Sequence, residues 1–236
     1  MSASSSVTSS TSVNNTNPMM EDEGWGSYLH DLYAFSLQYL HSPRAVGTPF
    51  PCSSFVAKEI VKYIPPASQN SEVPRRILEI GPGLGAFTGH IISKMGPNDH
   101  LDLVEIEKPF CDILNARYGH DKRVHVEHES ITEWHPELKY DYIVTAVPLN
   151  ALDFASLVKP ILESYVALLK EHGILSAIEY VGTSTLKRGL MCGEEQKSEF
   201  DKVQQLKTGF FDRYSFEKTV VVRNMPPARV FHCRKN

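Results

Sequence analysis

A glycine-rich segment that directly follows a buried strand constrains this chain more than any other feature. The run Ile77–Ile80 predicts a strand, and the chain continues through Gly81, Gly83 and Gly85 into a helical pattern that begins at Phe87. Glycines at a strand-to-helix turn let the backbone turn tightly and approach a ligand closely. We therefore expect a nucleotide-like ligand at the carboxyl end of this strand.

Strand and helix patterns alternate along the rest of the chain and predict the fold class. Two further strand-like runs, Lys218–Arg223 and Arg229–Cys233, lie too close together for a helical crossover, so they should pair as an antiparallel hairpin. The sequence thus predicts an α/β, Rossmann-like, doubly wound sheet that is mostly parallel and ends in an antiparallel hairpin strand. The other expected strands cover residues 77–80, 101–106, 124–127, 142–146 and 174–180, and the helices between them cover 87–95, 108–118 and 154–171.

Composition divides the chain into a tail and a single domain. Residues 1–23 are rich in Ser and Thr and predict a disordered tail, whereas residues 24–236 predict a single α/β domain. Within that domain, Trp25–Leu40 places aromatic and apolar residues on one helical face. We expect an amphipathic helix that caps the domain, with a lid over the site as the alternative. The polar segment Gly182–Lys197 predicts either a mobile lid or an ordinary surface loop.

Acidic side chains strengthen the expectation of a nucleotide-like ligand. Glu79 lies near the end of the first strand, where a carboxylate can accept a hydrogen bond from a ligand amine or order the loop. Glu105 ends the second strand, 20 residues after Gly85, at the position where an acid reaches the two hydroxyls of a ribose. Glu107 is the alternative for this role, because its side chain falls on the same side of the chain.

Two cofactors fit such a loop, NAD and S-adenosylmethionine. The spacing G-x-G-x-G with Ala86 next in the chain also satisfies the dinucleotide pattern. A chain of this length leaves no room for a second catalytic domain, and the terminal hairpin departs from an all-parallel dinucleotide fold. These two features favour S-adenosylmethionine.

Charge, cysteine content and hydropathy exclude several classes of function at this stage. The net charge of -4 argues against a general polyanion binder, so we expect no nucleic acid partner. The four cysteines form no C-x-x-C pair and have no histidine at zinc-ligand spacing, so we expect no metal site. No apolar run approaches the roughly 18–20 residues that span a bilayer, and the N-terminus lacks a signal peptide pattern. We therefore expect a cytoplasmic protein.

The segments around the glycine loop resemble a known family. Ile77–Thr88 (ILEIGPGLGAFT) resembles motif I of class I methyltransferases, in the branch that contains ribosomal RNA adenine dimethylases and bacterial phospholipid N-methyltransferases. Leu103–Lys108 and Thr145–Asn150 resemble the second and fourth motifs. Phe35–Ala57 and Val221–Phe231 resemble the leading segment and the terminal hairpin of phosphatidylethanolamine N-methyltransferases of the PmtA type. The resemblance implies a transferase that uses S-adenosylmethionine.

The resemblance also implies roles for individual residues. Ser130 stands where family members often carry an aspartate that accepts from the adenine amine, and the carbonyl of Ala146 would accept from an amine substrate. The methylated product is a bulky cation, which an aromatic face stabilises by up to about 2 kcal/mol when desolvated. Tyr28, Tyr33 and Tyr180 are the candidates for this catalytic role. The expected cofactor-binding residues are Glu79, Gly81, Gly83, Gly85, Glu105, Ser130 and Ala146.

The expected function is N-methylation of a phospholipid amine headgroup, with transient peripheral contact at the inner membrane face. Trp25–Leu40 contains no Lys or Arg, which disfavours anchoring to anionic lipids through that helix. Two alternatives stay open: an RNA or protein methyltransferase with the same cofactor site, and a non-catalytic methyltransferase-like binding module. The sequence carries no signal for the oligomeric state.

Overall fold

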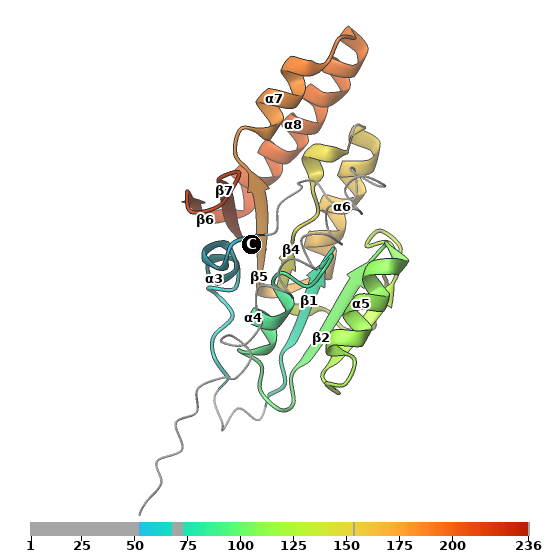
Figure 1. Cartoon of the computed structure of the whole chain (residues 1–236), viewed down its shortest axis with the longest axis vertical. Helices are drawn as coiled ribbons and strands as arrows, with labels where there is room; N and C mark the ends of the chain where they lie inside the picture. The colour runs from blue at the N-terminus through green and yellow to red at the C-terminus, as the bar shows by residue number, and fades with distance from the viewer. Residues whose placement is uncertain (1–51, 68–72, 153, 236) are drawn as a thin grey trace, which may run out of the picture.

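A seven-stranded sheet forms the centre of the computed structural model, which describes residues 52–67, 73–152 and 154–235. The strand order is β3-β2-β1-β4-β5-β7-β6 (Figure 1). The first five strands in that order are parallel, whereas β7 runs antiparallel to both β5 and β6. The predicted fold class, a mostly parallel Rossmann-like sheet with an antiparallel C-terminal hairpin, is therefore confirmed.

The boundaries of the elements follow the predicted runs within a few residues, apart from the segment after β5. The strands are β1 (Arg76–Ile80), β2 (His100–Glu105), β3 (Val124–His128), β4 (Tyr140–Thr145), β5 (Leu169–Tyr180), β6 (Ser215–Val221) and β7 (Ala228–Arg234). The helices are α3 (Ser54–Ile60), α4 (Thr88–Ile92), α5 (Lys108–Tyr118), α6 (Ala155–Leu168), α7 (Thr183–Leu190) and α8 (Glu194–Tyr214), with a short 3-10 helix η1 (Leu149–Ala151).

Both faces of the sheet are covered, as the apolar composition of its central strands requires. Successive residues of β1 alternate between the two sides, so Leu78 and Ile80 join one hydrophobic cluster and Ile77 joins the other. Helices α6 and α8 pack against each other on the first side, and α3 packs against β7 on the second. This arrangement leaves the carboxyl ends of β1, β2, β4 and β5 at a common edge, where ligands of open α/β sheets bind.

Helix α3 shows how a local sequence signal becomes tertiary structure. Ser53 caps the helix, since its hydroxyl accepts a hydrogen bond from the Val56 amide at 3.4 Å. The Ser53 amide in turn donates to Asn224 Oδ1, at 2.8 Å, in the turn before β7. The cap therefore also joins the start of the described chain to the terminal hairpin.

The segment after β5 differs from the prediction of a surface loop. Gly182 adopts a left-handed conformation with φ of 82°, and the chain then forms α7 and the long helix α8. The two helices lie alongside each other beyond one end of the sheet (Figure 1), joined by an ion pair between Arg188 and Asp201. The expectation of a surface loop was wrong, because the buried apolar residues of α8 begin at Phe200, beyond the polar segment Gly182–Lys197. The lid stays a prediction.

Residues 1–51 lie outside the described residues, so the tail and the helix at Trp25–Leu40 stay predictions. Within residues 52–67, 73–152 and 154–235, no helix combines the length and the apolar character that crossing a membrane requires.

Candidate functional site

The glycine loop at the end of β1 leaves backbone open to a ligand. Gly81, Gly83 and Gly85 all adopt left-handed conformations, with φ of 64°, 58° and 86°, which a residue with a Cβ rarely adopts. A Cβ at Gly85 would lie 2.9 Å from the ring of Tyr118, so Gly85 is also needed for packing. A Cβ at Gly83 would meet no atom of the described residues within 4 Å. The loop therefore turns tightly at Gly85 and presents an open surface at Gly83.

The structure distinguishes between the two acids considered for the ribose role. Glu105 Oε2 accepts a hydrogen bond from the Gly83 amide at 3.0 Å, and Oε1 accepts from the Glu107 amide at 3.0 Å. Burial raises the pKa of Glu105, and these amide donors oppose the effect. The Glu107 side chain instead lies at the start of α5 and makes no capping hydrogen bond. Glu105 is thus the carboxylate that faces the glycine loop.

Glu79 is a buried acid with unused hydrogen-bonding capacity. Its side chain is 1% exposed, and Thr88 donates a hydrogen bond to Oε2 at 2.6 Å. Oε1 has no hydrogen-bond partner among the described residues. Burial, together with the negative charge of Glu105, raises the pKa of Glu79 to about 8. A positively charged ligand group would satisfy Oε1 and lower this pKa.

The remaining predicted cofactor residues lie at the same edge of the sheet. Ser130 follows β3, and its hydroxyl bonds to Thr132 Oγ1 at 2.8 Å, so part of its hydrogen-bonding capacity is used locally. Ala146 follows β4, and its amide donates to the Ile80 carbonyl at 3.3 Å. Tyr28 and Tyr33 lie outside the described residues, so their proposed roles stay predictions.

A cavity of about 350 Å³ opens at the carboxyl ends of β4 and β5, beneath α7 and α8. It adjoins the glycine loop, because a Cβ at Gly81 would lie 3.1 Å from Val147 Cγ2 in the cavity wall. Tyr180 lines the cavity, and its hydroxyl lies 3.0 Å from Cys52 Sγ. Burial raises the pKa of Tyr180, so the phenol is neutral at physiological pH. Of the three predicted tyrosines, Tyr180 therefore reaches a cavity next to the cofactor loop.

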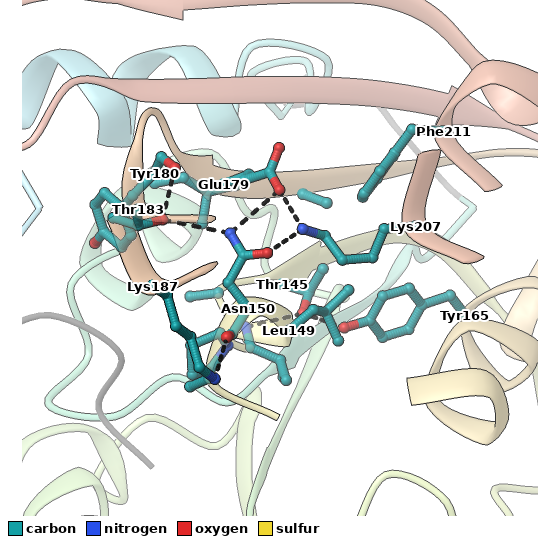
Figure 2. Close-up of a pocket in the computed structure, with 16 residues that line it drawn as sticks. Thr145, Leu149, Asn150, Tyr165, Glu179, Tyr180, Thr183, Lys187, Lys207 and Phe211 are labelled. Atoms are coloured by element: carbon teal, nitrogen blue, oxygen red, sulfur yellow. Dashed lines mark hydrogen bonds and ion pairs between the residues drawn. The ribbon is translucent and has the colours of Figure 1, made fainter. Parts of the chain in front are cut away.

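The polar end of this cavity is a network centred on Lys207. Its ammonium donates to Asn150 Oδ1 and to Glu179 Oε1, as Figure 2 shows. Asn150 Nδ2 donates to Glu179 Oε1 at 3.3 Å and to Thr183 Oγ1 at 3.4 Å. Arg229 Nη1 lies 3.6 Å from the other Glu179 oxygen. Glu179 thus points into the polar end of the cavity.

Lys207 is the functional candidate that the sequence reasoning missed. The lysines of residues 197–207 mix with acids in the sequence, a pattern typical of an exposed helix face, yet Lys207 is 3% exposed. Burial lowers its pKa, and Glu179 opposes that effect. The signal was helical spacing, since Lys207 lies four residues after buried Val203 and four before buried Phe211, on the same face of α8.

A second polar cluster joins α3 to the terminal hairpin, away from the cavity. Lys62 donates to Glu217 and lies 3.5 Å from Glu59, and Tyr63 also donates to Glu217. His232 is fully buried beside them, with Nδ1 hydrogen-bonded to Ser176 Oγ at 2.9 Å. The Lys62 ammonium offsets one of the two negative charges, and its bonds to Glu59 and Glu217 join α3 to the hairpin.

Comparison with known proteins agrees with this geometry. The family model described as "Ribosomal RNA adenine dimethylase" matches residues 44–170, just over half of the chain. The chain is 33% identical over 89 residues to ribosomal RNA small subunit methyltransferase A of Bordetella pertussis, covering 38% of this chain and 31% of that protein. It is 32% identical over 75 residues to malonyl-[acyl-carrier protein] O-methyltransferase 2 of Ilyobacter polytropus, covering 32% and 29%. The chain thus spans less than a third of the length of these curated relatives.

A solved structure shares the fold over most of the chain. N-methyltransferase NodS from Bradyrhizobium japonicum, in complex with S-adenosylhomocysteine, superposes with a TM-score of 0.55 at 16% identity. The superposition covers 77% of this chain and 86% of that one. At this level of identity, the likeness concerns the fold.

The hairpin-terminated sheet, with Glu105 turned toward the open glycine loop, has the class I methyltransferase fold. Within that class, the chain belongs to the ribosomal RNA adenine dimethylase family. This membership overturns our expectation that nucleic acid would not be a partner. That expectation was wrong because net charge averages over the whole chain and carries no information about one binding surface.

Proposed function

We propose that this protein transfers a methyl group from S-adenosylmethionine to an amino nitrogen, with an RNA base as the first acceptor to test. One observation carries the proposal: Val147 in the cavity wall lies beside the glycine loop, with its Cγ2 3.1 Å from where a Cβ on Gly81 would stand. An acceptor in the cavity would therefore lie next to a cofactor on the loop. The family match favours an RNA acceptor.

The residues present fit the cofactor chemically. Glu105 would accept hydrogen bonds from the ribose hydroxyls, since its carboxylate lies at the loop and retains unused lone pairs. Glu79 Oε1, which is buried without a partner among the described residues, would accept from the amino group of the methionine part. The open backbone at Gly83 lets the ligand approach closely. When bound, the cofactor supplies an electrophilic methyl group on a sulfonium.

The contribution of the protein to methyl transfer is mainly alignment. The transfer is an in-line displacement, so the acceptor nitrogen must face the methyl group within a narrow range of angles. The backbone carbonyls of Ala146 and Val147 would hold the amine by accepting its N–H groups. Tyr180 would stabilise the positive charge that develops on the nitrogen, through the face of its ring.

A phospholipid amine is the second candidate acceptor, and two observations favour it. Val221–Phe231 resembles the terminal hairpin of phospholipid N-methyltransferases. Helix α7, which contributes Thr183 to the cavity, also exposes Leu186 and Leu190, which are 66% and 72% exposed. Apolar side chains at the mouth of a cavity give a surface for peripheral contact with a bilayer.

Radiolabelled S-adenosylmethionine tests the proposal, in parallel incubations with structured RNA and with phosphatidylethanolamine vesicles. The expected result is labelled RNA, and loss of that label in Glu105→Ala. Labelled lipid with unlabelled RNA would replace the first candidate with the second. Absence of label in both, with intact cofactor binding, would contradict N-methylation of either acceptor.

A further inference from the structure

A histidine and two carboxylates converge between α3 and the terminal hairpin. Glu59 comes from α3, Glu217 from β6 and His232 from β7, and α3 packs against both strands (Figure 1). The ligand atoms of the three side chains all lie within 4.8 Å of one another. We propose that these side chains form a binding site for a divalent transition-metal ion of the Zn²⁺ type, which fastens α3 to the hairpin. The expectation of no metal site considered only spacing along the chain, which does not report residues that folding brings together.

The imidazole of His232 is the observation that points to a bound cation. His232 is fully buried, yet its Nε2 has no hydrogen-bond partner among the described residues. Nε2 lies 3.6 Å from Glu59 Oε1, which allows an ion pair with a protonated imidazole but is longer than a direct hydrogen bond. A buried polar nitrogen without a hydrogen bond is costly, and a metal ion held between Nε2 and the carboxylate removes that cost.

The spacing of the ligand atoms suits a transition metal. With bonds of about 2.1 Å, two ligands of a tetrahedral Zn²⁺ lie roughly 3.4 Å apart. The 3.6 Å between His232 Nε2 and Glu59 Oε1 is close to this separation. Glu217 is 29% exposed, so its carboxylate can shift by the small distance that coordination requires. One imidazole with two carboxylates favours Zn²⁺ over Mg²⁺ and Ca²⁺, which prefer oxygen ligands.

Neighbouring side chains orient the ligands, as outer partners do at metal sites. His232 Nδ1 lies 2.9 Å from Ser176 Oγ, and an Nδ1–H that donates to this hydroxyl leaves the lone pair of Nε2 available for a metal. The ring of Tyr63 packs edge-on against the imidazole, with 4.7 Å between the ring centroids. The Tyr63 hydroxyl also donates to Glu217, and Thr219 Oγ1 donates to Glu217 at 3.2 Å. The imidazole and one carboxylate are therefore held in place before a metal binds.

Lys62 competes with a metal ion for the two carboxylates. Its ammonium donates to Glu217 and lies 3.5 Å from Glu59, so it offsets one of the two negative charges. The Lys62 side chain is 44% exposed, and its long stem lets the ammonium move into solvent when a metal ion binds. Removal of Lys62 should therefore strengthen metal binding. A cluster that only packs α3 on the hairpin would not respond in this way.

Zn²⁺ titration of the full chain tests the site. Chelator-treated wild type, His232→Asn and His125→Asn compete with a chromophoric chelator for Zn²⁺ at about pH 7.5, where a free imidazole is neutral. His125 is the matched control, because it is an exposed histidine that lies 3.8 Å from a carboxylate, Asp102. We expect at least a tenfold loss of Zn²⁺ affinity in His232→Asn and wild-type affinity in His125→Asn. Equal affinity in wild type and His232→Asn, or no competition by wild type, would overturn the proposal.

Two further variants keep the proposal testable if His232→Asn fails to fold. Glu217→Gln keeps an oxygen that accepts from Tyr63 but removes the charged ligand, and we expect at least a tenfold loss of Zn²⁺ affinity. Lys62→Met removes the competing ammonium, and we expect a severalfold gain of Zn²⁺ affinity. Unchanged affinity in Glu217→Gln, or weaker binding in Lys62→Met, would overturn the site.

Thermal unfolding gives an independent readout of the metal as a fastener. At a free Zn²⁺ concentration about 100-fold above Kd, the Tm of wild type should rise by roughly 5–10 °C. The same Zn²⁺ concentration should leave the Tm of Glu217→Gln nearly unchanged, and Mg²⁺ should leave the Tm of wild type unchanged. An equal shift by Zn²⁺ in wild type and Glu217→Gln would place the metal elsewhere and overturn the proposal.

Discussion

Replacing Glu79 with Gln should stabilise the fold and weaken cofactor binding at the same time. The carboxyl is fully buried next to Glu105, and its pKa is raised to about 8 from 4.5. Between these two values the folded chain keeps a proton that the unfolded chain has lost. Stability contributed by this group is therefore present below pH 4.5 and is lost as the pH rises to 8.

The magnitude follows from the two pKa values. At pH 7, ionisation of Glu79 in the unfolded chain favours unfolding by about 3 kcal/mol. Glutamine has nearly the same shape, keeps an oxygen that accepts from Thr88, and does not ionise. The glutamine NH2 group would have no hydrogen-bond acceptor, but the protonated oxygen of Glu79 already lacks one. The substitution therefore loses little of the gain in stability. We expect Glu79→Gln to raise the free energy of unfolding by up to about 3 kcal/mol at pH 7.

Urea denaturation at pH 5 and pH 7 measures the stability change, and calorimetry with S-adenosylhomocysteine measures the loss of binding. The stability gain should be larger at pH 7 than at pH 5. Affinity should fall by roughly 10- to 100-fold, the effect of removing a hydrogen bond to a charged group. Glu127→Gln on β3 is the control and should change neither quantity. A destabilised Glu79→Gln variant, or one with wild-type affinity, would refute the assignment.

The other predictions concern protons, the loop and the hairpin. Cofactor binding should release up to about 0.9 proton at pH 7 as Glu79 ionises, and the calorimetric enthalpy should depend on the buffer; a buffer-independent enthalpy would contradict this. Gly85→Ala should destabilise the fold by more than about 2 kcal/mol, because of its φ of 86° and the Tyr118 contact, whereas Gly83→Ala should cost only about 1–2 kcal/mol and mainly reduce cofactor affinity. If urea denaturation showed the same loss of stability in Gly83→Ala and Gly85→Ala, the result would contradict an open surface at Gly83. Burial lowers the pKa of His232, so the unfolded chain takes up its proton first as the pH falls below about 6.5, and stability should decline there. His232→Asn should make Tm depend less on pH below about 6.5. An unchanged dependence of Tm on pH would exclude His232 as the cause of the decline.

The fold could be predicted because its signals are local. The apolar run at Ile77–Ile80, the glycines after it and the short turn between the last two strands each fix an element and its neighbour. Glu105 was predictable for the same reason, because the length of one β-α-β step determines where the next strand ends.

The acceptor end of the site could not be predicted, because it depends on long-range packing. Lys207 reaches Asn150 and Glu179 only after α8 has folded back over the sheet, and no local pattern reports that contact. In the sequence, Lys207 resembles its exposed neighbours such as Lys202. Its position in the buried stripe of α8 becomes clear only when the whole helix is considered. The net charge led to the wrong expectation about nucleic acid for a similar reason. It averages the charge of the whole chain and does not describe the charge of one binding surface.

Calorimetric titration of the full chain with S-adenosylhomocysteine tests the central claim most directly. We predict one site per chain, a roughly 10- to 100-fold weaker affinity in Glu105→Ala, and no competition by NAD. Absence of binding to the wild-type chain, or displacement of the ligand by NAD, would contradict a methyltransferase cofactor site at the glycine loop.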